Sequence, residues 1–243
     1  MNKLEVKDLQ KKFKNLEAVK KINFSLKENH TLALLGPNGC GKTTTIGMLL
    51  GLITPTYGQI FINEIELNYK NHQFLSKMNF ASPYVELPKK LTVSENLKVY
   101  GHMYQIKNLK NKLEQLTEEL NLKPFLNKKT GELSSGQKNR VSLAKSLIND
   151  PEILLLDEPT ASLDPDTGDY VRTYLEKYKK NNNISILLAS HNMNEVTRLS
   201  DYVLMMKEGT IIDHGNAQDL IQKHGRENLE QVFLKLVREK NEY

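Results

Sequence analysis

Four side chains in this sequence have the types and spacing to do chemistry on a phosphate. Lys42 and Thr43 end the glycine-rich segment GPNGCGKT, and Asp157 and Glu158 end the apolar run ILLLDE. A lysine can neutralise phosphate oxygens, hydroxyl and carboxylate oxygens are ligands for Mg²⁺, and a carboxylate can accept a proton from water. Together they indicate a site that binds a nucleoside triphosphate with magnesium.

The glycine-rich segment lies between an apolar strand-like run and a helical pattern, as a phosphate-binding loop requires. Its glycines let successive N–H groups point at phosphate oxygens, and the following helix start adds a favourable dipole. Lys42 should neutralise the β- and γ-phosphates, and the Thr43 hydroxyl should coordinate Mg²⁺. The alternative is a glycine-rich turn with an unrelated lysine. The expected nucleotide contacts are Gly36, Pro37, Asn38, Gly39, Cys40, Gly41, Lys42, Thr43 and Thr44.

The two carboxylates follow a run that is typical of a buried strand. They should therefore lie at the carboxyl edge of the sheet, where the ligands of α/β proteins bind. Asp157 would hold Mg²⁺ through water, and Glu158 is placed to polarise an attacking water as general base. The alternative is an acidic strand end that leads into a turn at Pro159.

A third motif, LSSGQ at residues 133–137, opens a helical pattern that continues to residue 148. Ser134 or Ser135 is a suitable N-cap, and Gly136 leaves the backbone accessible. A Ser-Ser-Gly helix cap is common on its own. Its position between the other two motifs predicts a second helix start that binds an anion.

Two kinds of sheet are needed to position these motifs. Continuous apolar runs predict strands buried on both faces, as in a parallel sheet covered by helices. Runs that alternate polar and apolar residues predict an antiparallel sheet beside that core. The continuous runs are residues 32–35, 153–156 and 186–189, and the alternating runs are residues 4–6, 22–26 and 59–63.

The remaining segments predict helices and two further strands. Residues 94–122 have helical spacing, which ends before Pro124 because proline cannot continue a regular helix. Residues 202–206 and 210–213 are strand-like. Two short helical patterns follow them and end near residue 239.

Composition limits the class of protein. A chain of 243 residues with 39% hydrophobic residues can bury the core of one domain. Its apolar runs are far shorter than the roughly 18 residues of a transmembrane helix, and its N-terminus lacks the apolar stretch of a secretory signal. A single cysteine excludes an internal disulfide, so a cytosolic protein is expected. The net charge of +5 is spread along the chain, so no nucleic-acid partner is expected.

In this order, GPNGCGKT, LSSGQ and ILLLDEPT resemble the motifs of the ATP-binding subunits of ABC transporters, over essentially the whole chain. The resemblance implies an α/β P-loop NTPase fold of ABC type. Its mainly parallel sheet would be flanked by helices, with an antiparallel β subdomain and a small helical subdomain. Residues 1–243 would be one ATP-binding domain, with the helical subdomain at about 84–150 and a C-terminal helical extension at about 216–243. Its ligands would be ATP and Mg²⁺, and its activity ATP hydrolysis coupled to transmembrane transport.

The resemblance also assigns further site residues. Phe13 matches the aromatic residue that stacks on adenine, Asp164 belongs to the D-loop at residues 161–164, and His191 matches the switch histidine. The implied sets are Glu158, His191 and Lys42 for catalysis, and Thr43 and Asp157 for the metal.

In this family two domains face each other head to tail. Ser135, Gly136 and Gln137 of one subunit would then bind the ATP held by the phosphate loop of the other. The implied partners are a second ATP-binding subunit, identical or closely related, and separate membrane-spanning permease subunits. The protein would be cytoplasmic and peripheral on the inner face of the cell membrane. The permease would select the substrate, and the similarity of EQVFLK at residues 230–235 to single-domain exporter subunits favours export over import.

One family residue is missing. The Q-loop glutamine, which contacts Mg²⁺ and relays nucleotide state to the permease, should precede residues 92–97, but this chain has FASPY at residues 80–84. Pro83 has no side-chain donor or acceptor. Because Glu158 and His191 remain, we expect hydrolysis to survive, with Ser82 or an added water completing the ion's ligands.

Cys40 gives a separate expectation. A thiol at a helix N-terminus beside Lys42 should have a lowered pKa. Its alkylation would block nucleotide binding and would be prevented by MgATP, unless Cys40 is an inert spacer.

Two other functions stay open from the sequence. A soluble ABC-type ATPase acting on ribosomes or DNA would need no membrane partner. Translation-type relatives usually have two ATP domains in one chain, however, and DNA-repair relatives have a long coiled coil between the first two motifs. A nucleotide sensor that does not hydrolyse ATP fits the missing glutamine and conflicts with Glu158.

Overall fold

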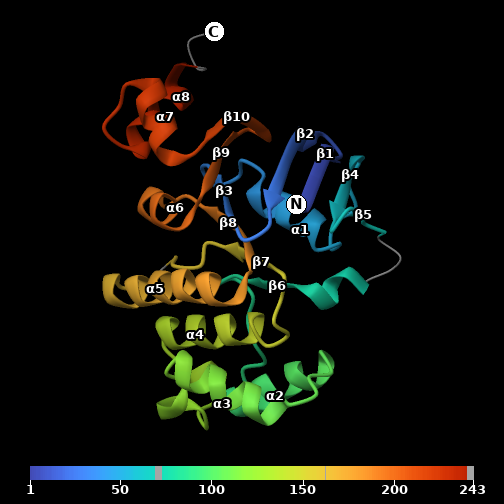
Figure 1. The fold of residues 1–243 in the computed structure, drawn as a ribbon, viewed down its shortest axis with the longest axis vertical. Coiled ribbons are helices and arrows are strands. Elements are labelled where there is room, and N and C mark those ends of the chain that lie inside the picture. Colours follow the sequence, from blue (N-terminus) through green and yellow to red (C-terminus); the bar gives the residue numbers. More distant parts are fainter. Residues whose placement is uncertain (69–72, 162, 240–243) are drawn as a thin grey trace.

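The computed structural model describes residues 1–68, 73–161 and 163–239. Its larger sheet has the strand order β10-β9-β3-β8-β7-β6, with helices against its faces (Figure 1). All strands except β10 run parallel to their neighbours, and β10 pairs antiparallel with β9. The strands are β3 (Thr31–Leu35), β6 (Met78–Ala81), β7 (Ile153–Asp157), β8 (Ser185–Ser190), β9 (Tyr202–Lys207) and β10 (Thr210–Gly215).

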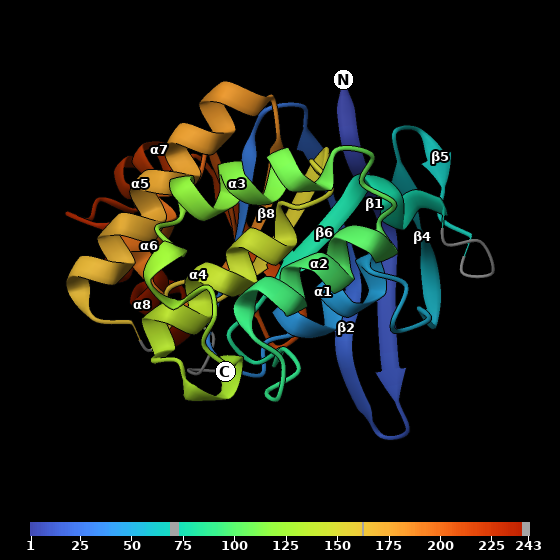
Figure 2. The same ribbon diagram turned by 90° about the horizontal axis from the view of Figure 1, so that it is seen from below.

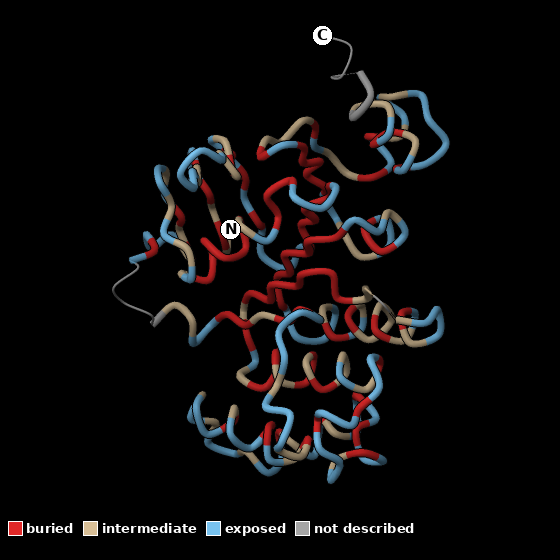
Figure 3. The backbone as a smooth tube through the Cα atoms, turned by 180° about the vertical axis from the view of Figure 1, so that it is seen from behind, coloured by how far each residue is buried: buried red, intermediate tan, exposed pale blue. Residues whose placement is uncertain are grey.

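The central strands β3, β7 and β8 are buried along their whole length because helices cover both faces of the sheet. Figure 3 shows their buried backbone as a continuous core between more exposed layers. Leu35 pairs with Ser190, and Asp157 pairs with Ala189. The carboxyl ends of the three strands therefore lie at one edge of the sheet, and the loops that leave them meet there.

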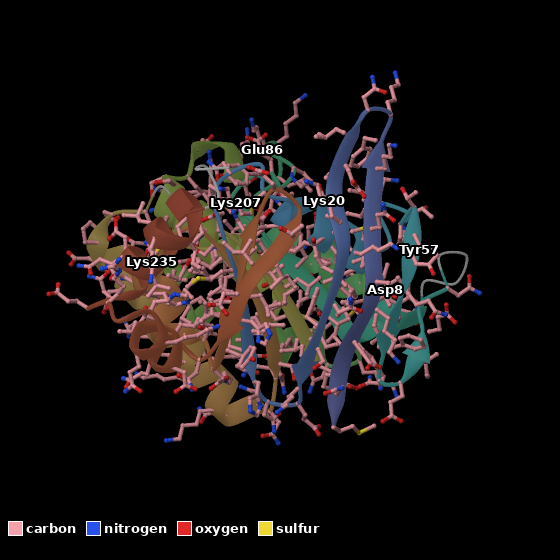
Figure 4. The ribbon with its side chains drawn as sticks, turned by 90° about the horizontal axis from the view of Figure 1, so that it is seen from above. Asp8, Lys20, Tyr57, Glu86, Lys207 and Lys235 are labelled. Atoms are coloured by element: carbon pink, nitrogen blue, oxygen red, sulfur yellow. The ribbon has the colours of Figure 1, made fainter. Side chains whose placement is uncertain are left out.

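The smaller sheet is antiparallel and has the order β2-β1-β4-β5. Along β1, buried Leu4, Val6 and Leu9 alternate with more exposed residues, as in a sheet with one face in solvent. The Lys20 N–H donates to the Gly209 carbonyl at 2.8 Å, and Figure 4 shows Lys20 beside Lys207 where the two sheets meet. The strands are β1 (Asn2–Phe13), β2 (Leu16–Lys27), β4 (Tyr57–Ile62) and β5 (Ile65–Glu66).

Helix α1 (Lys42–Leu49) fills the space between the sheets, and its Ile46, Met48 and Leu49 share one apolar cluster with both. The other face of the large sheet is covered by α5 (Pro165–Asn182) and α6 (Met193–Leu199), and by α7 (Ala217–His224) and α8 (Leu229–Glu239) at the end of the described chain. These last two helices lie at one end of the molecule (Figure 1).

A helical layer forms the opposite end, in front when the molecule is seen from below (Figure 2). It contains α2 (Val93–Met103), α3 (Leu109–Glu119) and α4 (Ser135–Ser146), with 3₁₀ turns at Lys123–Phe125 and Thr130–Glu132. A further 3₁₀ turn at Gln73–Lys77 leads into β6, and its Phe74 packs against the core between the sheets. Helix α4 joins the layer to the sheet, since Val141 and Ala144 share an apolar cluster with Leu154 and Leu156 of β7.

This architecture confirms the fold class predicted from the sequence: a parallel core, an antiparallel sheet and a helical layer. The predicted strands of the large sheet match β3, β7, β8, β9 and β10 within a residue or two. Strands β1 and β2 extend well beyond the predicted runs at residues 4–6 and 22–26, and the predicted helical run at residues 94–122 is divided into α2 and α3. Strands β5 and β6 were not predicted, because their two and four residues are too short to show a period. Among the described residues, the helices lack the length and apolar character needed to cross a bilayer.

Candidate nucleotide-binding and hydrolysis site

The glycine-rich segment connects the end of β3 to the start of α1. Gly41 has φ 107°, and a Cβ there would lie 2.6 Å from the Ala18 carbonyl oxygen of β2. A Cβ on Gly36 would lie 2.5 Å from the Met206 carbonyl oxygen of β9. Side chains at either position would therefore clash with backbone, so only glycine lets the loop turn this tightly between the two sheets.

Lys42 points back into this loop. Its ammonium donates to the carbonyls of Gly36 at 2.7 Å and of Pro37 at 3.2 Å, and only 5% of the residue is exposed. The loop thus places a buried cation among backbone amides. This is a suitable environment for phosphate oxygens, which could replace the two carbonyls as partners of the ammonium.

Thr43 and Asp157 come together from different elements. The Thr43 hydroxyl donates to Asp157 Oδ2 at 3.1 Å, while Asp157 Oδ1 is buried and has no hydrogen-bond partner among the residues that the structure describes. Burial raises the pKa of Asp157, and its contact with Thr43 opposes that rise. A buried carboxylate oxygen without a partner, next to a hydroxyl, fits the oxygen ligands that Mg²⁺ takes.

Glu158 lies between Lys42 and His191. Its Oε1 is 3.9 Å from Lys42 Nζ and 2.7 Å from His191 Nδ1. The imidazole contact is short but not aligned as a hydrogen bond, so Oε1 has no hydrogen-bond partner within the described part of the chain. The carboxylate is buried while 54% of the histidine side chain is exposed. The arrangement places the buried Glu158 carboxylate, a candidate base, next to the His191 imidazole, which is also accessible to solvent.

Other predicted residues lie around this centre. Phe13, at the end of β1, is 43% exposed, and its ring has the Lys11 ammonium 4.9 Å from the centroid. Asp164 caps α5 by accepting from the Thr167 N–H at 2.9 Å. The rest of the predicted D-loop includes residue 162, which lies outside the described residues.

The LSSGQ segment is not part of the same cluster. Ser134, rather than Ser135, is the N-cap of α4, and it forms a capping box with Gln137. Among the described residues, no hydrogen bond or ion pair joins residues 134–137 to residues 36–43. Ser135, Gly136 and Gln137 therefore make no such contact with the phosphate loop of their own chain.

The expected activation of Cys40 is wrong. Its thiol is 2% exposed, and burial raises its pKa although the charge of Lys42 opposes the shift. The N-terminus of α1 and Lys42 both lie near the thiol, as the sequence indicated. The surrounding protein, however, excludes the water that would stabilise a thiolate.

The segment without the glutamine follows β6. Ser82 is buried, and its hydroxyl accepts from the Tyr84 N–H at 3.3 Å. Tyr84 and Val85 are exposed beside a cavity of about 300 Å³ that also reaches Val141 of α4. The role of Ser82 as an ion ligand stays a prediction.

Sequence reasoning missed two residues that hold the turn after Glu158. Asn139 Nδ2 donates to the Pro159 carbonyl at 2.6 Å, and Thr160 donates to Glu195 at 2.7 Å. Their partners are 20 and 35 residues away, so only the folded chain brings them together.

Comparison with known proteins agrees with the motifs. A family model described as ABC transporter matches residues 19–161. The ABC transporter ATP-binding protein NatA of Bacillus subtilis is 30% identical over 94% of each chain. The spermidine/putrescine import ATP-binding protein PotA of Bacillus cereus is 30% identical over 90% of this chain and 68% of its own. The probable multidrug ABC transporter ATP-binding protein YbhF of Escherichia coli is 31% identical, and the match spans 96% of this chain but only 41% of that protein.

Solved structures show the same fold. The structure of an ATP-binding subunit of an ABC transporter superposes with a TM-score of 0.87 at 25% identity, over 96% of this chain and 99% of that one. A dimeric ATP-binding cassette in a post-hydrolysis state with bound ADP and Pi has a TM-score of 0.80 at 25% identity, over 88% of this chain and 98% of that one.

Proposed function

This chain is an ATP-binding subunit of the ABC transporter family and an ATPase, and from that premise we propose that it powers transport of a substrate through separate membrane-spanning subunits. The observation that carries the proposal is the meeting of Lys42, Glu158 and His191 at one edge of the sheet, with contacts of 3.9 and 2.7 Å to the central carboxylate.

The phosphate loop binds ATP. Lys42 exchanges its two carbonyl partners for the β- and γ-phosphates, and the amides of residues 36–43 and the start of α1 at Thr44 donate to the phosphate oxygens. Phe13 offers an exposed ring on which the adenine can stack. Thr43 and Asp157 would hold Mg²⁺, which would neutralise charge on the phosphates.

Glu158 takes the proton of the attacking water. Its burial removes competing water, and its position after β7 aims it at the phosphates held by the loop. His191 contacts the same carboxylate and is exposed on its other side, so it can orient both the base and the γ-phosphate. Loss of either group therefore lowers the rate of hydrolysis more than the affinity for ATP.

A second subunit completes each site. The segment Ser135, Gly136 and Gln137 is a capped helix start, and the described residues show no hydrogen bond between it and its own phosphate loop. In a head-to-tail dimer it binds the ATP of the partner, and Asp164 lies at that same interface. This arrangement gives two ATP sites, each built from both subunits.

The membrane partner docks beside the helical layer. The cavity of about 300 Å³ lined by Tyr84, Leu87 and Val141 is a suitable place for a segment of the permease. The chain then lies peripherally on the inner face of the membrane. Export is the proposed direction, supported by the resemblance of residues 230–235 to exporter subunits, although relatives include an importer.

The proposal is tested with Glu158→Gln. Removal of a general base lowers kcat by about 10²- to 10⁴-fold, so the variant should bind MgATP, hydrolyse it very slowly and stay dimeric. The variant is then used with MgATP to recover partners from detergent-solubilised membranes, with exposed Glu230→Gln as matched control.

A multi-spanning membrane protein recovered with Glu158→Gln is reconstituted with the wild-type chain in vesicles, where ATP outside should drive substrate inward if the chain serves an exporter. Recovery of ribosomal or DNA-associated proteins instead would overturn the transport role and leave the ATPase chemistry. Unchanged hydrolysis by Glu158→Gln would remove the assigned base.

A further inference from the structure

Glu195 is a buried carboxylate that none of these roles uses. It lies in the first turn of α6, and only 1% of the residue is exposed. A carboxylate in such a place needs hydrogen-bond donors to offset the loss of water. The Thr160 hydroxyl supplies one, since its Oγ1 donates to Oε1 at 2.7 Å. Burial raises the pKa of Glu195, and the Ser190 hydroxyl opposes that rise by favouring the charged form.

These two hydroxyls belong to the two segments that carry the catalytic groups. Thr160 comes two residues after Glu158, and Ser190 directly precedes His191. Strands β7 and β8 are neighbours in the sheet, so their carboxyl ends are already close. The Glu195 carboxyl group thus lies between the turn with the general base and the strand end with the histidine.

The turn that carries Glu158 needs such support. Glu158 has φ 54°, a left-handed conformation that residues other than glycine rarely adopt and that persists only where neighbouring contacts hold it. The Glu158 N–H donates to the Ala189 carbonyl at 2.8 Å, and Asn139 donates to the Pro159 carbonyl at 2.6 Å. The turn is therefore bonded to β8 through Ala189, to α4 through Asn139 and to α6 through Glu195.

Glu195 is itself fixed to the histidine segment. Asn192, the residue after His191, caps α6, and its side chain accepts from the Glu195 N–H at 3.1 Å. Movement of His191 relative to Thr160 would therefore stretch contacts on both sides of Glu195.

We propose that Glu195 is a positioning residue for ATP hydrolysis, which acts through its hydrogen bonds with Thr160 and Asn192 to fix the distance between Glu158 and His191. This inference rests on the proposed role of Glu158 as general base. It assigns Glu195 no contact with ATP, water or metal.

The test compares Glu195→Leu, which has a similar volume and no hydrogen-bond acceptor, with Glu195→Gln, which keeps one. Because a misplacement of about 1 Å in a catalytic group can cost roughly 100-fold in rate, Glu195→Leu should lower kcat by about that factor. Binding of a fluorescent ATP analogue should not change, since the phosphate loop is untouched. Glu195→Gln should recover most of the lost kcat.

Thr160 provides the second arm of the test. Thr160→Val removes the hydroxyl at nearly constant shape, and Thr160→Ser keeps it. If Glu195 acts through this hydroxyl, Thr160→Val should lower kcat as Glu195→Leu does, and the double variant should be no slower than either alone. Thr160→Ser should stay close to wild type, and exposed Glu230→Leu is the matched control for loss of a glutamate.

The outcomes separate the inference from the function on which it rests. A wild-type chain that does not hydrolyse ATP, or that equals Glu158→Gln, defeats the proposed function. If wild type is active, three results overturn the positioning role: wild-type kcat in Glu195→Leu, no recovery by Glu195→Gln, or an ATP affinity that falls in parallel with kcat.

Discussion

Burial sets the chemistry of the individual side chains at this site. Lys42 and Asp157 are both buried, so each interacts more strongly with a charged ligand than it would at the surface. Glu158 combines burial with a left-handed backbone, a conformation that costs about 1–3 kcal/mol and is maintained by the surrounding contacts. Fixing Glu158 in this conformation therefore lowers the free energy of unfolding of the protein.

The same burial predicts a slow reaction of Cys40. Its pKa lies above the ordinary 9.0, and each unit of increase lowers the thiolate fraction about tenfold below that pKa. Iodoacetamide should therefore label the folded chain more slowly than the urea-unfolded chain at pH 7–8, and the rate should rise as the pH passes 9. Equal rates in the folded and unfolded chains would contradict this expectation. Because Cys40 is the single cysteine of the sequence, Cys40→Ala is a complete blank for the labelling.

For individual residues, the sequence predicts the site residues that belong to a contiguous motif. Lys42, Thr43 and Glu158 could be named because local spacing defines them. Glu195 could not, because its partner Thr160 is 35 residues away and nothing in the sequence marks the pair. The pattern Asn192-x-x-Glu195 signals only a helix start. The pKa of Cys40 was predicted with the wrong sign because the sequence shows the neighbouring lysine and not the burial.

At the scale of elements, a lysine joins the helical layer to the sheet. Lys145 of α4 donates to the Phe80 carbonyl of β6 at 3.1 Å, and its ammonium lies 5.5 Å from the ring of Tyr100 in α2. Burial lowers the pKa of Lys145 to about 8. Asn79 and Asn149 add a hydrogen bond at 2.8 Å across the same junction. The strand that precedes the Ser82–Pro83 segment is thus tied to α4 by polar contacts.

The lowered pKa predicts a pH-dependent stability. In the unfolded chain the ordinary value of 10.5 applies, so between about pH 8 and 10.5 the unfolded state binds more protons than the folded state. The penalty of burying the charge is fully present below pH 8 and is lost as the pH rises. Relative to Lys145→Met, wild type should gain up to about 3 kcal/mol in free energy of unfolding across that window.

Urea unfolding at pH 7 and pH 10 measures this gain. Exposed Lys110→Met, on α3, is the matched control and should show no such trend. A difference between wild type and Lys145→Met that stays constant with pH would refute the assignment.

Elements were predictable where their pattern is long or strongly apolar. The buried strands β3, β7 and β8 were placed within a residue or two, and so was the pair β9 and β10. Strand β6 escaped because its pairing with β7, and not its own sequence, makes it a strand. The long hairpin of β1 and β2 was seen only in part, because register shifts interrupt its alternation.

At the scale of the whole molecule, the proposed dimer makes a prediction about mixtures. Lys42→Ala destroys the phosphate loop and leaves LSSGQ intact, and Gly136→Asp does the reverse. Each variant alone should be inactive. If the segments act across subunits, a mixed dimer contains one complete site, so an equal mixture should recover roughly one quarter of wild-type ATPase activity under random pairing.

If the phosphate loop and the LSSGQ segment of the same chain formed the site, the mixture would recover no ATPase activity, because each variant chain lacks one of the two segments. Mixing Lys42→Ala with Lys42→Ala,Gly136→Asp is the control, since neither chain of that mixture supplies a phosphate loop.

The strand order also bears on how the chain is made. In the described part of the chain, β3, which leads into the phosphate loop, pairs with β8 and β9 and no other strand, at residues 185–190 and 202–207. Strands β1, β2 and β4 can associate early in synthesis, but β3 must wait for its neighbours. At about 5–20 residues per second, that wait lasts roughly 10–30 s on the ribosome. During it the apolar sequence TLALL is unpaired, so the nascent chain should depend on chaperones until its last third has emerged.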